Sequence, residues 1–180
     1  EASTNFYVQK KPVLYFYKVE NTTEDNTVTV SGKLLNNGKA IKGATITLNV
    51  NGKDVTVTPN NDGYFKYSFK AVAGENVVTA SYAGTTEYAE ANATTSVYAL
   101  MKTTLYAYKI ENANTQDSIK VSGKLLNKGK AVVGETVTIN VNGKTYTATT
   151  NKDGYFQVSI KLAVVGENNL TVSYAGSDVY

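Results

Sequence analysis

The feature that most constrains the fold of this 180-residue chain is an internal repeat with a period of 91 residues. Leu14-Tyr15 recurs as Leu105-Tyr106, and residues 30–36 recur unchanged as residues 121–127. One residue is inserted in the second copy near Leu162, so residues 81–84 recur 92 positions later, at 173–176. Because such repetition reflects two copies of one structural unit, we expect two domains of the same fold.

Within each copy, apolar and polar residues alternate with the period of two that marks β-strands with one buried face. Val28, Val30 and Leu34 alternate with polar residues, and a second alternating run leads into Asn51-Gly52. Asn-Gly between alternating runs predicts a hairpin, because both residues tolerate the positive φ of a type I′ turn. Asp62-Gly63 marks a second tight turn, and Gly74 is expected to open a last hairpin.

No segment combines helical periodicity with helix caps. The pattern therefore predicts an all-β chain of two tandem immunoglobulin-like (Ig-like) β-sandwiches, with about seven strands each. The first domain is placed at residues 11–99 and the second at residues 100–180, with the last strand of the second missing within the chain.

The two ends of the repeat do not match. Residues 2–8 align with residues 93–99, which form the final strand predicted for the first domain. Residues 1–10 are therefore expected to be a last strand that belongs to a preceding repeat or is donated to a neighbouring chain. Its inward-facing residues, which would form the donated-strand interface, are Ala2, Thr4, Phe6 and Val8.

Two explanations of this offset remain open. The chain is either a window cut from a longer covalent array, or a subunit whose first strand completes the second domain of the next copy. Such a contact is heterologous, so it propagates head to tail into a filament. In both cases the expected partners are other copies of the same repeat.

The composition excludes several functions. The chain has no His, Cys, Trp or Arg, which removes the usual general base, the thiol nucleophile and the soft-metal ligands. We therefore expect no catalytic residues, no metal site and no cofactor. The net charge of +3 comes from scattered lysines, so nucleic-acid binding is not expected. No apolar run approaches the length of a membrane span.

Two kinds of candidate site remain. Asn21, Asn92 and Asn169 each begin an Asn-X-Thr sequence, which is the acceptor for glycosylation. Exposed tyrosines form a second group, because aromatic rows on strands pack at domain junctions or stack on sugars. This group comprises Tyr15, Tyr17, Tyr98, Tyr106 and Tyr108.

The chain resembles the tandem Ig-like repeats of bacterial and archaeal surface adhesins, especially archaeal adhesin-like proteins. The resemblance is carried by residues 38–40, 50–53, 62–64 and 81–84 and by their second copies. It implies an extracellular, non-enzymatic, cell-surface stalk or adhesin segment that supports adhesion. The alternatives are an extracellular filament subunit assembled by strand donation and, from another class, a carbohydrate-binding module. A cell-surface glycan or protein partner would remain unidentified.

Overall fold

The computed structural model describes residues 3–115, 117–161 and 164–180. The chain divides into two compact units, residues 1–100 and residues 101–180. Over the described residues every regular element is a β-strand, and all pairings but one short pair and one isolated bridge are antiparallel. The chain is therefore all-β, and each unit is an Ig-like sandwich, as the alternation predicts.

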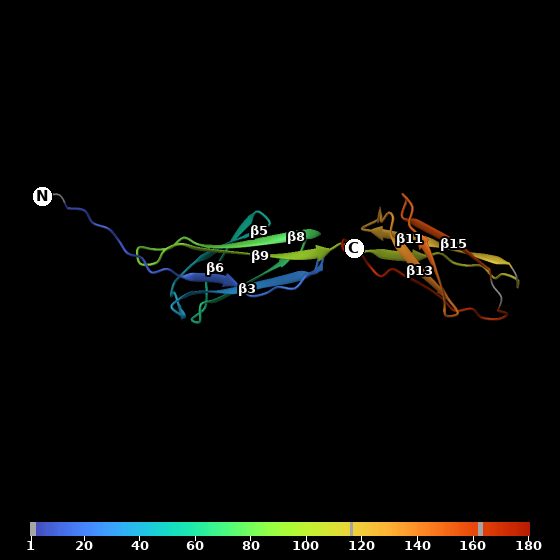
Figure 1. Cartoon of the computed structure of the whole chain (residues 1–180), viewed down its shortest axis with the longest axis horizontal. Helices are drawn as coiled ribbons and strands as arrows, with labels where there is room; N and C mark the ends of the chain where they lie inside the picture. The colour runs from blue at the N-terminus through green and yellow to red at the C-terminus, as the bar shows by residue number, and fades with distance from the viewer. Residues whose placement is uncertain (1–2, 116, 162–163) are drawn as a thin grey trace. The chain divides into compact units, whose positions relative to one another are not determined.

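The first unit contains two sheets, and Figure 1 labels β3 of one and β5, β6, β8 and β9 of the other. In the described residues, one sheet has β3 at its centre, paired with β1, β4 and β7, and the other has the order β2-β9-β8-β5-β6. The strand bounds are β1 Val13–Phe16, β2 Thr22–Thr23, β3 Thr27–Asn36, β4 Lys39–Ala40, β5 Ile46–Val50, β6 Lys53–Val57, β7 Tyr64–Lys70, β8 Gly74–Tyr82 and β9 Ala91–Leu100.

The predicted Asn51-Gly52 hairpin is confirmed. Both residues have positive φ, 50° and 87°, and β5 pairs with β6 directly across them. The hairpin expected at Gly74 is wrong, because β7 pairs with β3 in one sheet whereas β8 pairs with β5 and β9 in the other. The chain crosses between the sheets here since β7 and β8 bury their alternate residues from opposite sides of one core.

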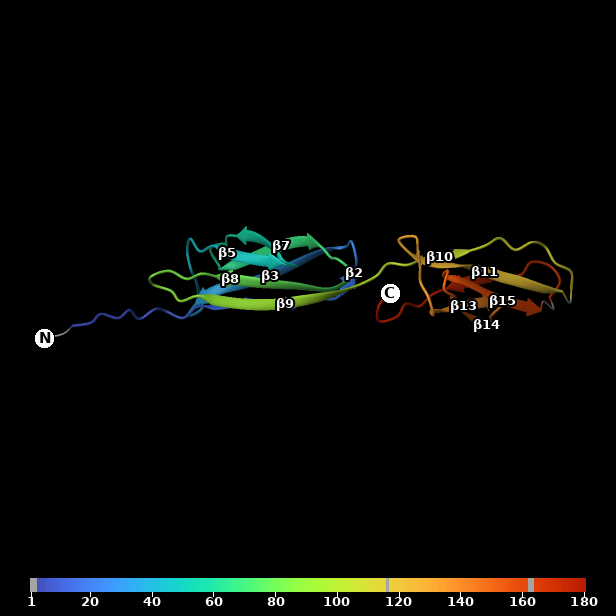
Figure 2. The same ribbon diagram turned by 90° about the horizontal axis from the view of Figure 1, so that it is seen from above.

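The final strand predicted for the first unit is present as β9. It lies beside β8 over its whole length, from Gly74 opposite Ala99 to Tyr82 opposite Ala91, as Figure 2 shows. Val97 and Ala99 are buried while Tyr98 between them is exposed. These two residues complete a core cluster with Val28, Val30, Ala71 and Val78.

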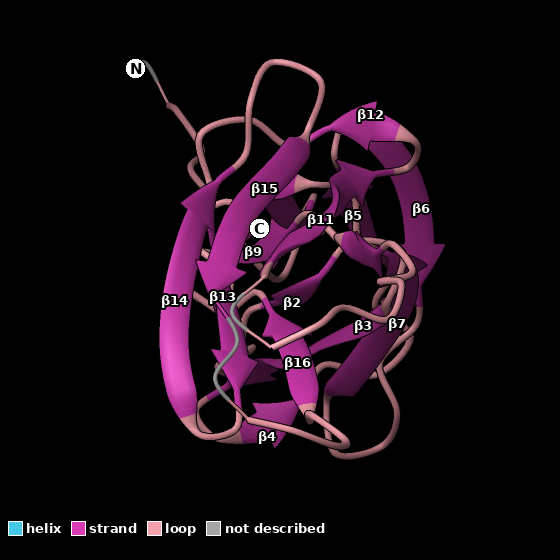
Figure 3. Cartoon of the chain, turned by 90° about the vertical axis from the view of Figure 1, so that its right-hand side faces the viewer, coloured by secondary structure: helices cyan, strands magenta, loops and turns pink. Residues whose placement is uncertain are grey.

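The second unit repeats the strands of the first up to this point, except that its described residues contain no counterpart of β2. Its described strands are β10 Thr104–Ala107, β11 Ser118–Asn127, β12 Lys130–Ala131, β13 Thr136–Val141, β14 Lys144–Thr149, β15 Tyr155–Lys161 and β16 Leu170–Ser173. One sheet has β11 paired with β10, β12 and β15. In the other, β13 lies between β14 and β16 (Figure 3).

The described residues of the second unit contain no strand at the position of β9. β16 pairs with β13 on one side, and no described strand pairs with its other edge. This agrees with the prediction that the second sandwich lacks its last strand within the chain. An unpaired edge leaves backbone N–H and C=O groups that a further strand can bind.

Candidate functional site

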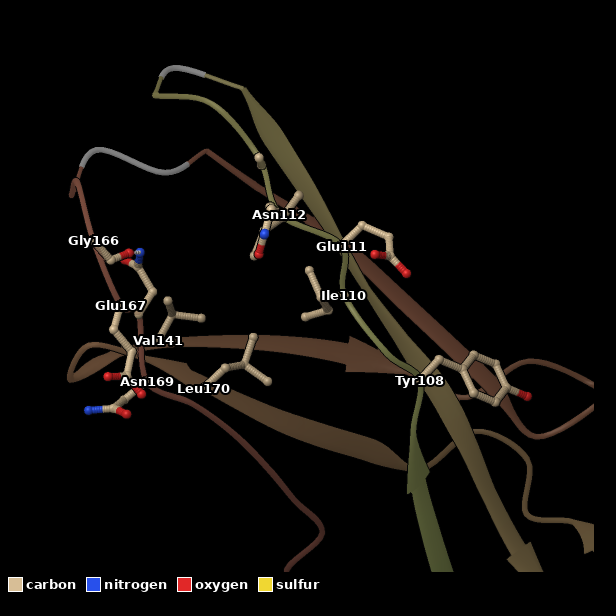
Figure 4. Close-up of a pocket in the computed structure, with 12 residues that line it drawn as sticks. Tyr108, Ile110, Glu111, Asn112, Val141, Gly166, Glu167, Asn169 and Leu170 are labelled. Carbon is tan, nitrogen blue, oxygen red and sulfur yellow. Dashed lines mark hydrogen bonds between the residues drawn. The ribbon is translucent and has the colours of Figure 1, made fainter.

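The second unit carries a groove of about 670 Å³ at the start of β16, lined there by residues 166–170. Four apolar side chains line it: Ile110 from the loop after β10, Ile119 from β11, Val141 from the end of β13 and Leu170 from the start of β16. Figure 4 shows Ile110, Val141 and Leu170 pointing into a common space. We call this the acceptor groove.

In the first unit the same place is filled by β9. The residues that correspond to the lining through the repeat are Val19, Val28, Val50 and Val78. All four belong to, or pack against, the cluster that contains Val97 and Ala99. The acceptor groove is therefore the place that the inward side chains of a last strand would occupy.

A polar contact also marks this place. In the first unit, the Asn21 side-chain oxygen accepts a hydrogen bond from the Tyr98 N–H of β9, at 2.9 Å. The counterpart of Asn21 is Asn112, which lines the acceptor groove (Figure 4). An asparagine oxygen thus stands where it can receive one backbone N–H of an incoming strand and so define its register.

The opposite wall is built around Asn168. Its amide nitrogen donates to Gly166 O at 2.9 Å, and its oxygen accepts from Asn142 Nδ2 at 2.7 Å. Asn76 makes the same contacts in the first unit and also donates to Val97 O of β9, at 3.4 Å. The wall is therefore formed before any strand binds, which lowers the ordering cost of binding.

The N-terminal segment lies in the open. Residues 3–9 form no strand, and Thr4, Phe6 and Val8 are exposed, with 84% of Phe6 and of Val8 accessible. Ala2, the fourth residue of the predicted donated-strand interface, lies outside the described residues. Exposed apolar residues at alternate positions of an unpaired segment are the pattern of a strand that lacks its sheet.

The segment is anchored where it joins the first unit. Lys10 N–H donates to Glu87 O at 2.9 Å, and Gln9 Nε2 donates to Thr85 O at 2.7 Å. The Lys10 ammonium also forms an ion pair with the Glu87 carboxylate, and this hydrogen bond raises the pKa of Lys10. The hydrogen bonds at Gln9 and Lys10 therefore fix the point at which residues 3–8 extend from the first unit.

The tyrosines form two small clusters at equivalent places. In the first unit, Tyr17 contacts Tyr15 with ring centroids 5.5 Å apart, and Tyr64 at 6.4 Å; in the second, Tyr108 contacts Tyr155 at 6.3 Å. The Tyr15 and Tyr17 rings stand at 81° to one another, so they do not offer parallel faces to a sugar ring. Tyr98 and Tyr106 are exposed and contribute to no such ring contact among the described residues.

The three candidate glycosylation sites are exposed. Asn21 precedes β2 and holds β9 through its side-chain oxygen, whereas Asn92 lies on β9 itself. Asn169 stands at the rim of the acceptor groove.

The described residues hold no group of three or more Asp and Glu side chains placed to bind a metal ion. Acidic groups in the groove lining are Glu111 and Glu167, on different segments of the unit. Within the described part of the chain, no helix has the length and apolar character needed to cross a membrane.

The sequence predicts donor residues for a strand exchange but does not point to the residues that would accept them. The lining residues Ile110, Ile119, Val141 and Leu170, together with Asn112 and Asn168, were not singled out. The signal was available in the repeat. Each apolar residue lies one repeat after a residue of, or packed against, the cluster that contains Val97 and Ala99, and each asparagine lies one repeat after one that hydrogen-bonds to β9. To find these residues through the repeat, one must know which residues β9 contacts, and only the folded first unit shows those contacts.

No family model matches the chain, and no curated protein matches it in sequence. Among solved structures, a 1.5-MDa bacterial ice-binding adhesin is 17% identical, with 94% of this chain and 65% of that chain covered at a TM-score of 0.41. A Ca²⁺-stabilised adhesin of an Antarctic bacterium is 19% identical, with 88% and 46% covered at 0.39.

The eight N-terminal Ig domains of Down Syndrome Cell Adhesion Molecule are 9% identical, with 95% of this chain and 28% of that chain covered at a TM-score of 0.49. The chain thus spans less than two thirds of each of these structures. At such identities and TM-scores, the likenesses do not bear on what this chain binds.

Proposed function

We propose that the chain is a structural segment of an extracellular, cell-surface stalk that supports adhesion. The observation that carries the proposal is the path of the chain through the first unit. The chain is held at Lys10 beside Glu87, before β9 begins, and it leaves at Leu100, where β9 ends. Entry and exit therefore lie at opposite ends of one ten-residue strand, as a stalk repeat requires.

The connection to the next repeat supports the same role. β9 ends at Leu100, and the N–H of the next residue, Met101, already donates to Val179 O within the second unit, at 2.8 Å. This bond is the counterpart of the Lys10–Glu87 bond in the first unit. The chain therefore passes from one repeat to the next without a flexible spacer, so that load is transmitted through folded units.

Tension along this path would act on the pairing of β9. β2 runs parallel to β9, with Thr22 opposite Ala99 and Thr23 opposite Leu100, and Glu24 N–H donates to Leu100 O at 2.8 Å. When two paired strands are pulled along their length, the hydrogen bonds between them bear the load at the same time and resist the sliding of one strand past the other. This is the arrangement expected of a unit that bears force.

Single-molecule stretching tests this role. We expect the first unit to unfold at a higher force than the second, and Asn21→Ala to lower the force for the first unit because β9 loses one bond. Asn112→Ala is the matched control: at single-molecule dilution the acceptor groove is empty, so the force for the second unit should not change. Equal forces for both units would argue against load transfer through β9.

A test in cells is independent of mechanics. Antibodies raised against the chain should label intact cells of its source, and external protease should remove the label. Labelling that requires cell lysis would overturn the proposed location.

A filament subunit assembled head to tail by donation of residues 1–10 is the second candidate function. The acceptor groove favours it, because the groove lies where a donated last strand would bind. In this case the partner is another copy of the same repeat.

A further inference from the structure

We propose that residues 4–9 of one copy of this chain bind as an antiparallel strand in the acceptor groove of a second copy, in one register set by Asn112 and Asn168. The inference deepens the proposed function, and rests on it only in that the partner is another copy of the repeat.

The register follows from the repeat. Residues 4–9 correspond to residues 95–100 of β9, so Phe6 and Val8 take the places of Val97 and Ala99. In the first unit Val97 lies opposite Asn76 and Ala99 opposite Gly74. In the groove, Phe6 therefore lies opposite Asn168 and Val8 opposite Gly166.

The same correspondence predicts the polar contacts. Tyr98 corresponds to Tyr7, so the Tyr7 N–H donates to Asn112 Oδ1, as the Tyr98 N–H does to Asn21. Asn168 Nδ2 is placed to donate to Phe6 O, as Asn76 does to Val97 O. A shift of one residue along the groove would turn Phe6 and Val8 out to solvent and bring polar residues inward, so the register is strongly selected.

Side-chain size favours residues 4–9 over a copy of β9. The donor is larger at two of its three inward positions, with Phe6 in place of Val97 and Val8 in place of Ala99, and Thr4 matches Thr95. The second unit is smaller at three positions that pack against the Val97 cluster in the first. There, Phe16, Tyr67 and Phe69 are replaced by Ala107, Val158 and Ile160.

Part of this space is taken up again. Ile110, Ile119 and Leu170 each carry one methylene more than the valines that they replace. The lost aromatic rings are larger than these additions, so a net space remains for the Phe6 ring. Because protein interiors are packed to a constant density, a bulkier donor and a roomier acceptor match one another.

Burial of apolar side chains that are exposed on the donor segment and in the acceptor groove favours binding. Phe6 and Val8 are largely exposed and Leu170 is half-buried, whereas their counterparts Val97, Ala99 and Val78 are buried. Ile110 is half-buried, as is its counterpart Val19. Binding would bury both sets together and pair the backbone of residues 165–170, the segment that leads into β16. Since donor and acceptor lie on different parts of the molecule, the contact propagates from copy to copy.

The first experiment measures the mass of the 180-residue chain by light scattering across a concentration series. We expect oligomers whose size grows with concentration, and a monomer for the double variant Phe6→Asp/Val8→Asp. These residues are exposed, so the variant leaves both units folded. Phe6→Val should weaken association by about tenfold, because it removes buried apolar area.

The second experiment tests the register by cross-linking, since the chain has no cysteine of its own. Glu75 lies opposite Tyr98 in the first unit, so chains carrying Tyr7→Cys and chains carrying Glu167→Cys should form a disulfide-linked dimer when mixed. Asn5→Cys with Glu167→Cys is the matched mismatch, two residues out of register. It should react about tenfold more slowly or not at all.

The third experiment tests the preference for the donor. The Phe6→Asp/Val8→Asp chain serves as acceptor for labelled synthetic peptides of residues 3–10 and residues 94–101. We expect the first peptide to bind about tenfold more tightly than the second.

Each of the following results would overturn the proposal: a chain that stays monomeric at high concentration, oligomers that persist in the double variant, or equal cross-linking rates for matched and mismatched cysteines. A chain carrying both Tyr7→Cys and Glu167→Cys that cross-links only within itself would also do so. None of these results would touch the stalk function, which the surface labelling of cells tests separately.

Discussion

Asn51 and Asn76 are joined side chain to side chain in the first unit, with Asn51 Nδ2 donating to Asn76 Oδ1 at 2.9 Å. The Asn76 oxygen also accepts from Val72 N–H, and its nitrogen donates to Val72 O and Gly74 O. Asn76 is completely buried. One side chain thus ties the β5–β6 turn to the crossover between the sheets.

Replacement of Asn76 by alanine should destabilise the first unit by about 3 kcal/mol, because it leaves several buried partners without a hydrogen bond. The matched variant Asn168→Ala should cost the second unit about 1 kcal/mol, because the groups around Asn168 can reach water. Denaturant unfolding followed by amide hydrogen exchange separates the two units. If both substitutions lowered the free energy of unfolding by the same amount, burial by β9 would not affect the hydrogen bonds of Asn76.

Gly32→Ala should destabilise the first unit by about 3 kcal/mol or more, because a Cβ there would lie 2.0 Å from Tyr15 O and 2.7 Å from the Phe65 ring. Gly38→Ala is the control, since a Cβ at that turn meets no atom within 4 Å and the cost comes from its positive φ alone. Thermal unfolding of the two variants gives the comparison. A mild effect at Gly32 would mean that β1 can move away from β3.

Tyr82→Phe should stabilise the first unit by about 1 kcal/mol, because the buried Tyr82 hydroxyl has no hydrogen-bond partner in the described structure. The equivalent tyrosine of the second unit, Tyr174, donates to Glu135 Oε2 at 2.8 Å. Tyr174→Phe should therefore destabilise by a similar amount. The first unit lacks this bond because Ala44 stands where the second unit has Glu135. Denaturant unfolding should show a higher free energy of unfolding for the first unit with Tyr82→Phe and a lower one for the second unit with Tyr174→Phe.

Alkaline pH should weaken the second unit through Tyr174. Burial, supported by the hydrogen bond to Glu135, raises the pKa of Tyr174 above the usual 10.0. The folded state therefore favours the neutral phenol, and its contribution to stability is fully present below pH 10 and is lost as the pH rises through the raised pKa. The stability of Tyr174→Phe should fall less than that of the unaltered chain as the pH rises above about 10. If the stability of the two proteins changed equally with pH, Tyr174 would not be the source of the alkaline loss.

The repeat and its alternation determined most of the fold without the structure. Val28, Val30 and Leu34 point to one face because successive strand residues do so, and Asn51-Gly52 turns because both residues accept positive φ. The same repeat predicts Phe6 and Val8 as inward residues of a last strand. These are local properties of a chain, so they can be read along it.

The tertiary structure decided what local patterns do not contain. Gly74 opens a crossover because β7 and β8 belong to opposite sheets, which depends on contacts between distant segments. The acceptor groove is assembled from Ile110, Ile119, Val141 and Leu170, which are far apart in sequence and meet only when two sheets pack. Sequence determines which face of each strand is buried, whereas only packing determines which faces meet and where one is left uncovered.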